Sequence, residues 1–456
     1  MTQIYAKQAL LPDGWHHDVR VSFAGTRITA VETGRSNGTG TTPDHHVDCL
    51  LPAPSNSHSH GFQRAMAGLT EARGNTSDSF WTWRDLMYRF LGHLTPDHLQ
   101  AITAFAQMEM LQAGYAACGE FHYLHHGRDG QVYDNLAEMA CRVVAAAQNS
   151  GIGLTLLPVH YQFGGCDGRA LHGGQLRFGN DLDRYSKLYS YADSAMSELA
   201  DDSAIGIAPH SPRAISSSYL RLYPTMTNGP IHLHFAEQQA EMDEIEAVHA
   251  TRPSRWLQEN VALDSRWCLI HGTQLASADI AALAETGLTF ALCPVTEASL
   301  GDGIFDASAL IEAGGHFGVG TDSNIRIGLQ GELRMLEYSQ RLRDQQRAVL
   351  ADQSQSTGRF LYEHIVRGGA RALGRDAGCI AVGQHADLLA LDCSQPDLAD
   401  RSGDVLMDSF IFVGDDRMIG DVWAGGRHLV QNGRHIHADD IVAHYRTTMA
   451  HLMALL

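Results

Sequence analysis

Short apolar stretches alternate with longer amphipathic ones through the middle of the chain. Runs rich in β-branched and aromatic residues predict strands at 47–52, 115–123, 152–160, 204–210, 230–236, 267–272, 288–293 and 316–322. Segments with helical spacing lie between them, at 97–113, 131–148, 237–249, 276–284 and 331–343. Strands that are apolar throughout are typical of sheets covered on both faces. The pattern therefore predicts an α/β protein in which βαβ units close into a (β/α)8 TIM-like barrel.

The two ends of the chain have another pattern. Residues 4–32 and 378–435 contain short alternating strands separated by Gly, Asp and Asn turns. We expect a small composite β-sandwich domain formed from both termini, with the barrel inserted between them and a closing helix from about Asp439. The predicted domains are the N-terminal part of the β-sandwich, the metal-dependent barrel, and the C-terminal part with the closing helix: residues 1–52, 53–375 and 376–456.

Charge and composition exclude several classes of partner. The 456 residues include 33 Lys and Arg against 52 Asp and Glu, a net charge of −19, so binding to nucleic acid or to an anionic membrane is not expected. No apolar run approaches the ~20 residues of a membrane helix. The first residues resemble no secretory signal, and the eight cysteines are scattered without a CxxC pair. We expect a cytoplasmic protein.

Histidine is abundant, with 26 residues, so the informative histidines are those at the ends of predicted strands, where parallel barrels build their active sites. His58 and His60 follow the first predicted barrel strand. Residues two apart in an extended chain project to the same side, so both side chains can bind one ion. The motif alone is weak, because two solvated histidines in a polar loop would give the same sequence.

Further candidates close later predicted strands. His234 precedes Glu237 at a strand-to-helix turn, whereas His232 is better interpreted as a packed interior residue. His271 and Asp322 each end a strand; taken singly, a core histidine and a helix N-cap explain them equally well. A carboxylate beside a metal-bound histidine would supply a proton carrier next to a Lewis acid. We therefore interpret the four strand ends together, as one site.

Three imidazoles and one carboxylate suit zinc with a position left open for water. The predicted ligands are His58, His60, His234 and Asp322. Binuclear sites in barrels of this type commonly use a carboxylated lysine, but the only lysines, Lys7 and Lys187, lie outside the predicted strand ends. One zinc ion per subunit is the prediction, and Glu120 at a strand end leaves a carboxylate-bridged alternative open.

The order of these motifs resembles the mononuclear deaminase branch of the amidohydrolase superfamily. The resemblance rests on HSH at 58–60, HLHFAE at 232–237, IHG at 270–272 and GTDS at 320–323. Longer motifs resemble the N-formimino-L-glutamate deiminase family of histidine degradation: HSHGFQRAMAGLTE (58–71), FWTWRDLMYRF (80–90), EFHYLHH (120–126), APHSPRA (208–214) and CPVTEASLGDGIF (293–305). The resemblance covers essentially the whole chain. This sequence departs from the family pattern at Gly61, where alanine is expected, and at Pro212, which stands between Ser211 and Arg213.

The resemblance implies a role for each matched residue. It implies that the predicted ligands bind zinc, that Glu237 is the proton shuttle, and that His271 orients or activates water together with Asp322. It also implies a homodimer. The substrate residues implied by the family are Gln63, Arg84, Tyr123, His210 and Arg213.

The implied reaction is the hydrolysis of N-formimino-L-glutamate to N-formyl-L-glutamate and ammonia. The small anionic substrate carries a cationic amidine and two carboxylates, so acceptors are needed at one end and arginines at the other. A purine or related-ring deaminase of the same branch is the alternative; it would need a flat aromatic pocket and fewer carboxylate anchors. A catalytically inactive scaffold of the same fold is a further alternative, although every expected ligand is present.

Overall fold

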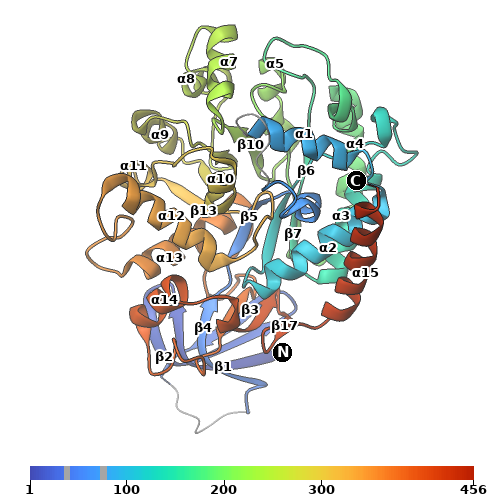
Figure 1. Cartoon of the computed structure of the whole chain (residues 1–456). Coiled ribbons are helices and arrows are strands. Elements are labelled where there is room, and N and C mark those ends of the chain that lie inside the picture. Colours follow the sequence, from blue (N-terminus) through green and yellow to red (C-terminus); the bar gives the residue numbers. More distant parts are fainter. Residues whose placement is uncertain (35–41, 72–79, 456) are drawn as a thin grey trace.

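The computed structural model describes residues 1–34, 42–71 and 80–455. Parallel strands form the centre of the larger part of the molecule (Figure 1). These strands are β5 (Ser55–Ser59), β6 (Ala117–His122), β7 (Gly153–His160), β8 (Ala204–Ile205), β9 (Ala208–Pro209), β10 (Ile231–Phe235), β11 (Trp267–His271), β12 (Thr289–Leu292) and β13 (His316–Val319). Nearly all of their residues are buried. Strand β7 is largely apolar, as expected of a strand covered on both faces, whereas β5 is polar and still buried.

Two isolated bridges close these strands into a ring. Ile207 beside β9 pairs with Ile231 of β10, and Ser59 of β5 pairs with Asp322, just beyond β13. The predicted strand 204–210 is split into β8 and β9, which both pair with β7, so the ring has eight positions. The predicted (β/α)8 barrel is confirmed.

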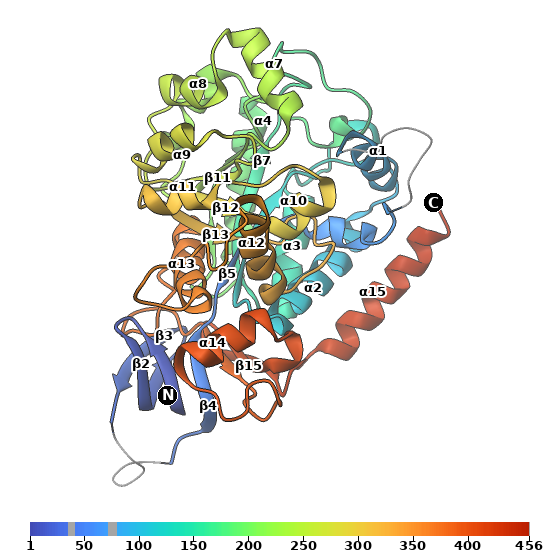
Figure 2. The ribbon, with the colours of Figure 1, turned by 60° about the vertical axis from the view of Figure 1, so that its left-hand side comes forward.

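Helices follow the barrel strands; most cover the outer faces of the strands, whereas α1 (Phe80–Leu91) contributes to the cavity at the end of the barrel (Figures 1 and 2). The others are α2 (Pro96–Gln112), α3 (Glu138–Ser150), α4 (Leu182–Met196), α5 (Ser217–Leu220), α6 (Tyr223–Met226), α7 (Gln239–His249), α8 (Pro253–Asn260), α9 (Ser277–Ala284), α10 (Pro294–Leu300), α11 (Ala307–Glu312), α12 (Leu329–Asp344) and α13 (Thr357–Ala372). Helix α7 begins two residues later than predicted, because Gln238 is extended, with φ −119° and ψ 143°.

Strands from both termini form a second, composite β-domain, as predicted. They are β1 (Thr2–Leu11), β2 (Gly14–Ala24), β3 (Arg27–Glu32), β4 (His45–Pro52), β14 (Leu388–Leu391), β15 (Ile419–Ala424), β16 (Arg427–Gln431) and β17 (Arg434–His435). They lie on one eight-stranded path, in which β4 pairs with β14 and so joins the two halves. Ile4, Val21, Leu388 and Trp423 belong to its separate core. The exact domain limits of 1–52, 53–375 and 376–456 stay predictions.

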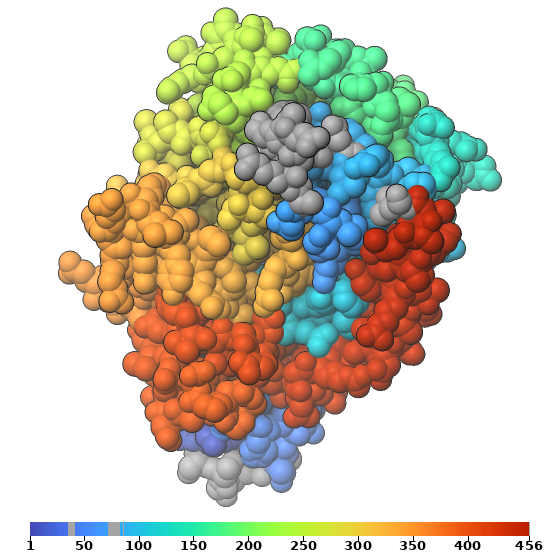
Figure 3. Space-filling view, viewed as in Figure 1, coloured from blue at the N-terminus to red at the C-terminus, as the bar shows by residue number. Residues whose placement is uncertain are grey.

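The chain returns from the β-domain to the barrel at its end. Helix α14 (Gly403–Phe412) lies beside the β-domain, and α15 (Ala438–Met453) runs back along the barrel surface (Figures 2 and 3). Tyr445 of α15 stacks on Phe105 of α2, with ring centroids 3.9 Å apart and an interplanar angle of 8°. Within the described ranges, no helix has the length and apolar character needed to cross a membrane.

Candidate metal centre and active site

The end of β5 supplies two of the predicted ligands. His58 and His60 project to the same side of the extended chain, and their ring centroids lie 4.6 Å apart. The Nε2 atoms of His58 and His60 lie 3.4 and 3.3 Å from the Oδ1 atom of Asp322. All three side chains are buried. The first and last strands of the barrel therefore place these groups together.

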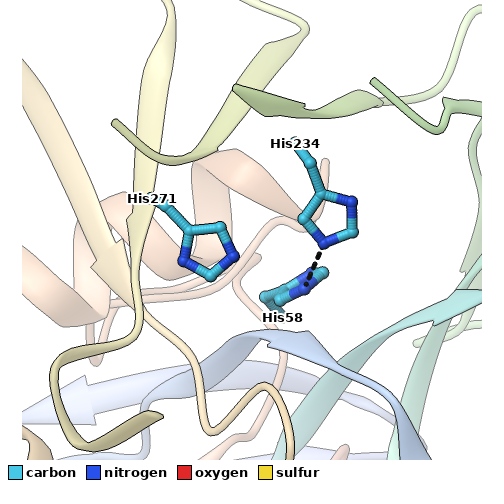
Figure 4. Close-up of side chains that lie close together, drawn as sticks. All are labelled: His58, His234 and His271. Atoms are coloured by element: carbon cyan, nitrogen blue, oxygen red, sulfur yellow. Dashed lines mark hydrogen bonds between the residues drawn. The ribbon is translucent and has the colours of Figure 1, made fainter. Parts of the chain in front are cut away.

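His234 approaches the same point from β10. Its Nε2 atom lies 3.2 Å from the Nε2 atom of His58 (Figure 4). The Nδ1 atoms of His234 and His60 lie 3.2 and 2.9 Å from the backbone oxygens of His210 and Phe121. When each Nδ1 donates its hydrogen to that oxygen, Nε2 presents a lone pair to the centre, the arrangement typical of metal-binding histidines.

The backbone around Asp322 places its carboxylate against the histidines. The N–H of Asp322 donates to the oxygen of His58 (3.0 Å), and the N–H of His60 donates to the oxygen of Asp322 (2.9 Å). Gly320 permits this approach, because a Cβ there would lie 2.7 Å from the backbone N and O of His58. Asp322 itself has a φ of +46°, a strained conformation that the surrounding contacts impose.

The four side chains have the electrostatic character of a metal site. Burial lowers the pKa of His58 to about 3 and lowers the pKa of His234 far below its usual value, so both imidazoles are neutral near pH 7. Burial opposes ionisation of Asp322, but its hydrogen bond with His58 and the positive charge of His271 hold the pKa of Asp322 below its usual range. Neutral imidazoles and an ionised carboxylate are the forms that bind metal ions.

A divalent cation fits this donor set. The two facing Nε2 atoms of His58 and His234 lie at 3.2 Å; when both carry lone pairs they repel unless a positive charge lies between them. His58, His60 and Asp322 form one group in which a single ion can be held, and His58, His234 and His271 form another. The predicted ligands are therefore brought together in a metal-capable cluster.

Glu237 and His271 lie beside the cluster. The Nε2 atom of His271 is 3.9 Å from Oε1 of Glu237 and 3.8 Å from Oδ2 of Asp322, distances too long for direct hydrogen bonds and suited to a bridging water. Burial raises the pKa of Glu237 to about 7, so this carboxyl can hold or release a proton near neutral pH. For His271, burial opposes protonation, but the charge of Glu237 and the contact with Glu297 raise its pKa to about 10.

One cavity adjoins the cluster and contains every predicted substrate residue. Its lining includes the metal-side groups His60, His234, Glu237, His271 and Asp322 together with Gln63, Arg84, Tyr123, His210 and Arg213. Gln63 donates from Nε2 to the hydroxyl of Tyr123 at 2.7 Å, while its Oε1 atom is buried without a partner among the described residues.

The two arginines reach this cavity from different sides. Arg84 lies on α1 with its guanidinium 5.6 Å from the ring centroid of Tyr88. Arg213 follows β9, and its Nε atom is buried without a hydrogen-bond partner in the described part of the chain. His210 stays neutral between these groups, because burial and the charge of Arg213 hold its pKa well below the usual value. Two cationic groups therefore line this cavity, in a protein of net charge −19.

Comparisons with known proteins agree with this geometry. The model of the amidohydrolase family matches residues 49–429. The chain belongs to the amidohydrolase family. Residues 1–45 match the model described as formimidoylglutamate deiminase HutF, N-terminal domain. A formimidoylglutamate deiminase from Pseudomonas aeruginosa is 44% identical over 438 residues, covering 95% of this chain and 96% of that protein. Within the family, the chain therefore belongs with the formimidoylglutamate deiminases.

Solved structures show the same fold over nearly the whole chain. The crystal structure of an amidohydrolase from Brucella melitensis has a TM-score of 0.95 at 42% identity and covers 99% of this chain and 100% of that one. An adenosine deaminase from Xanthomonas campestris, solved with bound zinc, has a TM-score of 0.83 at 20% identity and covers 99% and 98%. At that identity the likeness concerns the fold alone.

The structure adds residues that the sequence pattern did not single out. Tyr161, Phe178 and Met87 also line the cavity of this amidohydrolase, and Phe121 packs its ring 4.3 Å from that of His234. Tyr161 directly follows β7, so its position at a strand end was the available signal. Phe121 lies in the buried strand β6 and within the motif at 120–126, but neither signal separates it from an ordinary core residue.

Glu120 does not take the bridging position that the sequence left open. Its Oε1 atom accepts the N–H of Gly61 at 2.7 Å, and its neighbour Phe121 is the residue of β6 that faces the histidines, as alternation along a strand requires. Crowding by Thr103, with Glu120 beside it, explains the glycine at 61. A Cβ there would lie 2.9 Å from side-chain atoms of Thr103 and 3.2 Å from Oε1 of Glu120.

Proposed function

We propose that this amidohydrolase is a zinc-dependent formimidoylglutamate deiminase, which hydrolyses N-formimino-L-glutamate to N-formyl-L-glutamate and ammonia in histidine degradation. The observation that carries the proposal is one cavity in which Arg84 and Arg213 share the lining with Glu237, His271 and Asp322. The relative from Pseudomonas aeruginosa bears the name of this activity.

His58, His60, His234 and Asp322 would hold the zinc ion. Bound zinc lowers the pKa of its water toward ~7 and so supplies hydroxide at neutral pH. The protein contributes the geometry: the Nδ1 contacts of His60 and His234 with backbone oxygens fix which ring nitrogen faces the centre. Asp322 faces His58 and His60 with Oδ1, and its other oxygen, Oδ2, lies 3.8 Å from Nε2 of His271.

The proton transfers belong to three side chains. Asp322, assisted by His271, accepts the proton of the attacking water as its oxygen bonds to the formimino carbon. Glu237, whose pKa burial raises to about 7, passes protons to the departing nitrogen. The C–N bond to that nitrogen then breaks, ammonia leaves, and the oxygen stays on carbon as the formyl group. A carboxyl with a pKa near the working pH is suited to give and take a proton in one cycle.

The cavity matches the two ends of the substrate. The Oε1 atom of Gln63, which has no partner in the described part of the chain, can accept an N–H from the substrate, while Tyr123 accepts a hydrogen bond from Nε2 of the same amide. Arg213, whose Nε has no partner among the described residues, and Arg84 can bind the substrate carboxylates, because guanidinium groups engage carboxylates through paired hydrogen bonds. Neutral His210 adds a hydrogen-bonding group without adding charge.

A purine deaminase is the rival activity, and relatives with that kind of name are found: a 5-methylthioadenosine/S-adenosylhomocysteine deaminase from Haloquadratum walsbyi is 29% identical, covering 76% of this chain and 72% of that protein. Two arginines in the cavity favour a dicarboxylate over a neutral ring. The test is ammonia release from N-formimino-L-glutamate, adenosine, guanine and N-guanidino acids under the same conditions. Turnover of adenosine or guanine above that of formiminoglutamate would overturn the proposal.

Zinc stoichiometry, assembly and location complete the proposal. We propose one zinc ion per subunit, a homodimer and a cytoplasmic location. Metal analysis of protein purified without chelator should give about one zinc per chain, and light scattering coupled to size exclusion should give twice the mass of 49.7 kDa. Iron in place of zinc, two metal ions per chain, or a monomer would contradict the corresponding part.

A further inference from the structure

Glu297 contacts the inner edge of the His271 ring. Its Oε1 atom lies 3.2 Å from Nδ1 of His271 and also accepts the backbone N–H of Cys293 at 2.8 Å. An oxygen that already accepts one N–H is an acceptor for its other neighbour as well, so Nδ1 of His271 carries the hydrogen and donates it to Glu297. All three residues are buried.

We propose that Glu297 is the positioning residue that fixes the ring of His271 for the reaction. This inference rests on the proposed function, because the ring it orients is the one beside Glu237 and Asp322. With Nδ1–H donated to Glu297, the opposite atom, Nε2, faces Glu237 at 3.9 Å and Asp322 at 3.8 Å. Glu297 itself does not line the cavity, so it acts only through His271.

The backbone at His271 explains why such a tether is needed. His271 has a φ of +72° and so does Gly272, so β11 turns away in the left-handed region just where the ring leaves the strand. Non-glycine residues adopt this conformation at a cost and are held in it by their surroundings. The ring of His271 lies almost parallel to that of His234, with centroids 5.5 Å apart and an interplanar angle of 11°. Stacking alone does not distinguish the two ring orientations related by a half-turn about the Cβ–Cγ bond, and the bond from Nδ1 to Glu297 selects one of them.

Glu297 is itself held in place by the first turn of α10. The backbone N–H of Glu297 donates to the backbone oxygen of Cys293, and the backbone oxygen of Glu297 accepts the N–H of Asp302, both at 2.9 Å. The side chain therefore reaches back to a fixed backbone, and the line from Cys293 through Glu297 to His271 is rigid. Supporting groups of this kind are usually worth ~10–100-fold in activity.

Glu332 provides a matched control. It is a second buried glutamate that supports the same helix, with Oε2 accepting the N–H of Val295 at 3.0 Å, and its hydrogen bonds in the described residues do not include His271. Replacing either glutamate removes a buried carboxyl and a bond to the start of α10. Only Glu297→Ala also removes the partner of the His271 ring.

The experiment compares Glu297→Ala, Glu297→Gln and Glu332→Ala in the zinc-loaded enzyme. We expect Glu297→Ala to lower kcat ~10–100-fold with KM changed less than about threefold and zinc content unchanged. Glu297→Gln, whose amide oxygen can still accept from Nδ1, should recover most of kcat. Glu332→Ala should keep kcat within about threefold of the parent value, even if its melting temperature falls as far as that of Glu297→Ala. Equal losses of kcat in the two alanine variants, or no loss in Glu297→Ala, would overturn the proposal.

A second readout does not depend on activity. With ¹⁵N-labelled histidine, the Nδ1–H of His271 should give a slowly exchanging, downfield proton signal, assigned by its loss in His271→Gln. The signal should disappear in Glu297→Ala and persist in Glu297→Gln and Glu332→Ala. A signal that survives in Glu297→Ala refutes the tether, whereas parent enzyme that shows the signal but does not release ammonia from formiminoglutamate refutes the proposed function alone.

Discussion

Asp322 and His58 are joined twice, once through the backbone and once through their side chains. The N–H of Asp322 donates to the oxygen of His58 at 3.0 Å, and Oδ1 of Asp322 lies 3.4 Å from Nε2 of His58. The contact that closes the barrel between its first and last strands is therefore also the contact that assembles the metal-capable cluster. The closed barrel therefore already holds His58 and Asp322 side by side.

Replacing Asp322 should remove zinc without dismantling the barrel. Asp322→Asn keeps the backbone bonds to His58 and loses the anionic ligand, so we expect zinc content below about 0.1 per chain and kcat/KM reduced by more than ~1000-fold. Inductively coupled plasma analysis and ammonia release are the measurements. Glu120→Gln is the control: its side chain bonds to Gly61, so zinc should stay at one per chain, and loss of zinc there would revive a bridging role for Glu120.

Glu237→Gln should separate metal binding from proton transfer. The amide is nearly isosteric but cannot carry the proton, so we expect full zinc content with kcat lowered by about 100- to 10,000-fold. Steady-state kinetics and metal analysis on the same sample check both halves of the expectation. Near-normal turnover in this variant would show that another group delivers the proton.

Arg213→Ala should weaken recognition of the carboxylates of the substrate. Removing a guanidinium that makes a charge-assisted contact costs about 2 to 3 kcal/mol, so kcat/KM should fall about 30- to 150-fold, mainly through KM. Arg184→Ala, which removes an arginine from α4 outside the cavity lining, is the control for the change in net charge. An unchanged KM in Arg213→Ala would place the carboxylates elsewhere in the cavity.

The barrel and the cluster were predictable for a common reason. Hydrophobic periodicity identified the strands, and in a parallel barrel the ends of strands meet at one edge, so His58, His234 and Asp322 could be placed together although they are far apart in sequence. The long motifs then identified Gln63 and Arg213, which no periodicity distinguishes. The grouping of the three predicted ligands follows from topology, whereas the assignment of Gln63 and Arg213 to the same site follows from the family resemblance alone.

What the sequence could not predict depends on tertiary contacts between ordinary residues. Glu297 follows the start of a helix, where a glutamate has many structural uses, and only the approach of β11 gives it His271 as a partner. The break between β8 and β9 was equally hidden, because residues 204–210 read as one apolar strand. Gly61 was noted as a departure from the family pattern, but its cause is a side chain from α2.

The crowding of residue 61 by Thr103 can be tested by enlarging the first residue and shortening the second. Gly61→Ala would place a methyl group 2.9 Å from Thr103, and overpacking of this kind costs about 1 to 3 kcal/mol. We expect a lower free energy of unfolding and some loss of zinc, since His60 directly precedes the site of change. In the Gly61→Ala/Thr103→Ala double variant the methyl gains room, so the alanine at 61 should cost less there than in the parent background; an equal cost in both backgrounds would contradict the steric explanation.

The acid sensitivity of the protein should depend on the contact between the barrel and the β-domain. Asp202, which precedes β8, accepts bonds from Arg427 of β16 at 2.6 and 3.1 Å, and Arg375 lies 3.9 Å away. Burial opposes ionisation of Asp202, but the bond and charge of Arg427 prevail and lower the pKa of Asp202 below its usual value. The ionised carboxylate thus stabilises the folded state above its unfolded pKa of ~3.9, and that stabilisation is lost as the pH falls through the lower folded pKa.

Asp202→Asn should therefore cost stability at neutral pH and flatten the acid limb of the stability curve. We expect a loss of about 2 to 3 kcal/mol at pH 7, below the range for fully buried pairs because Arg427 keeps contact with solvent, and a smaller loss below pH 4. Urea unfolding from pH 3 to 7 measures both. Arg427→Ala should give the same trend, and the double variant should lose less than the sum of the two single changes; additive losses would show that the pair does not act as a unit.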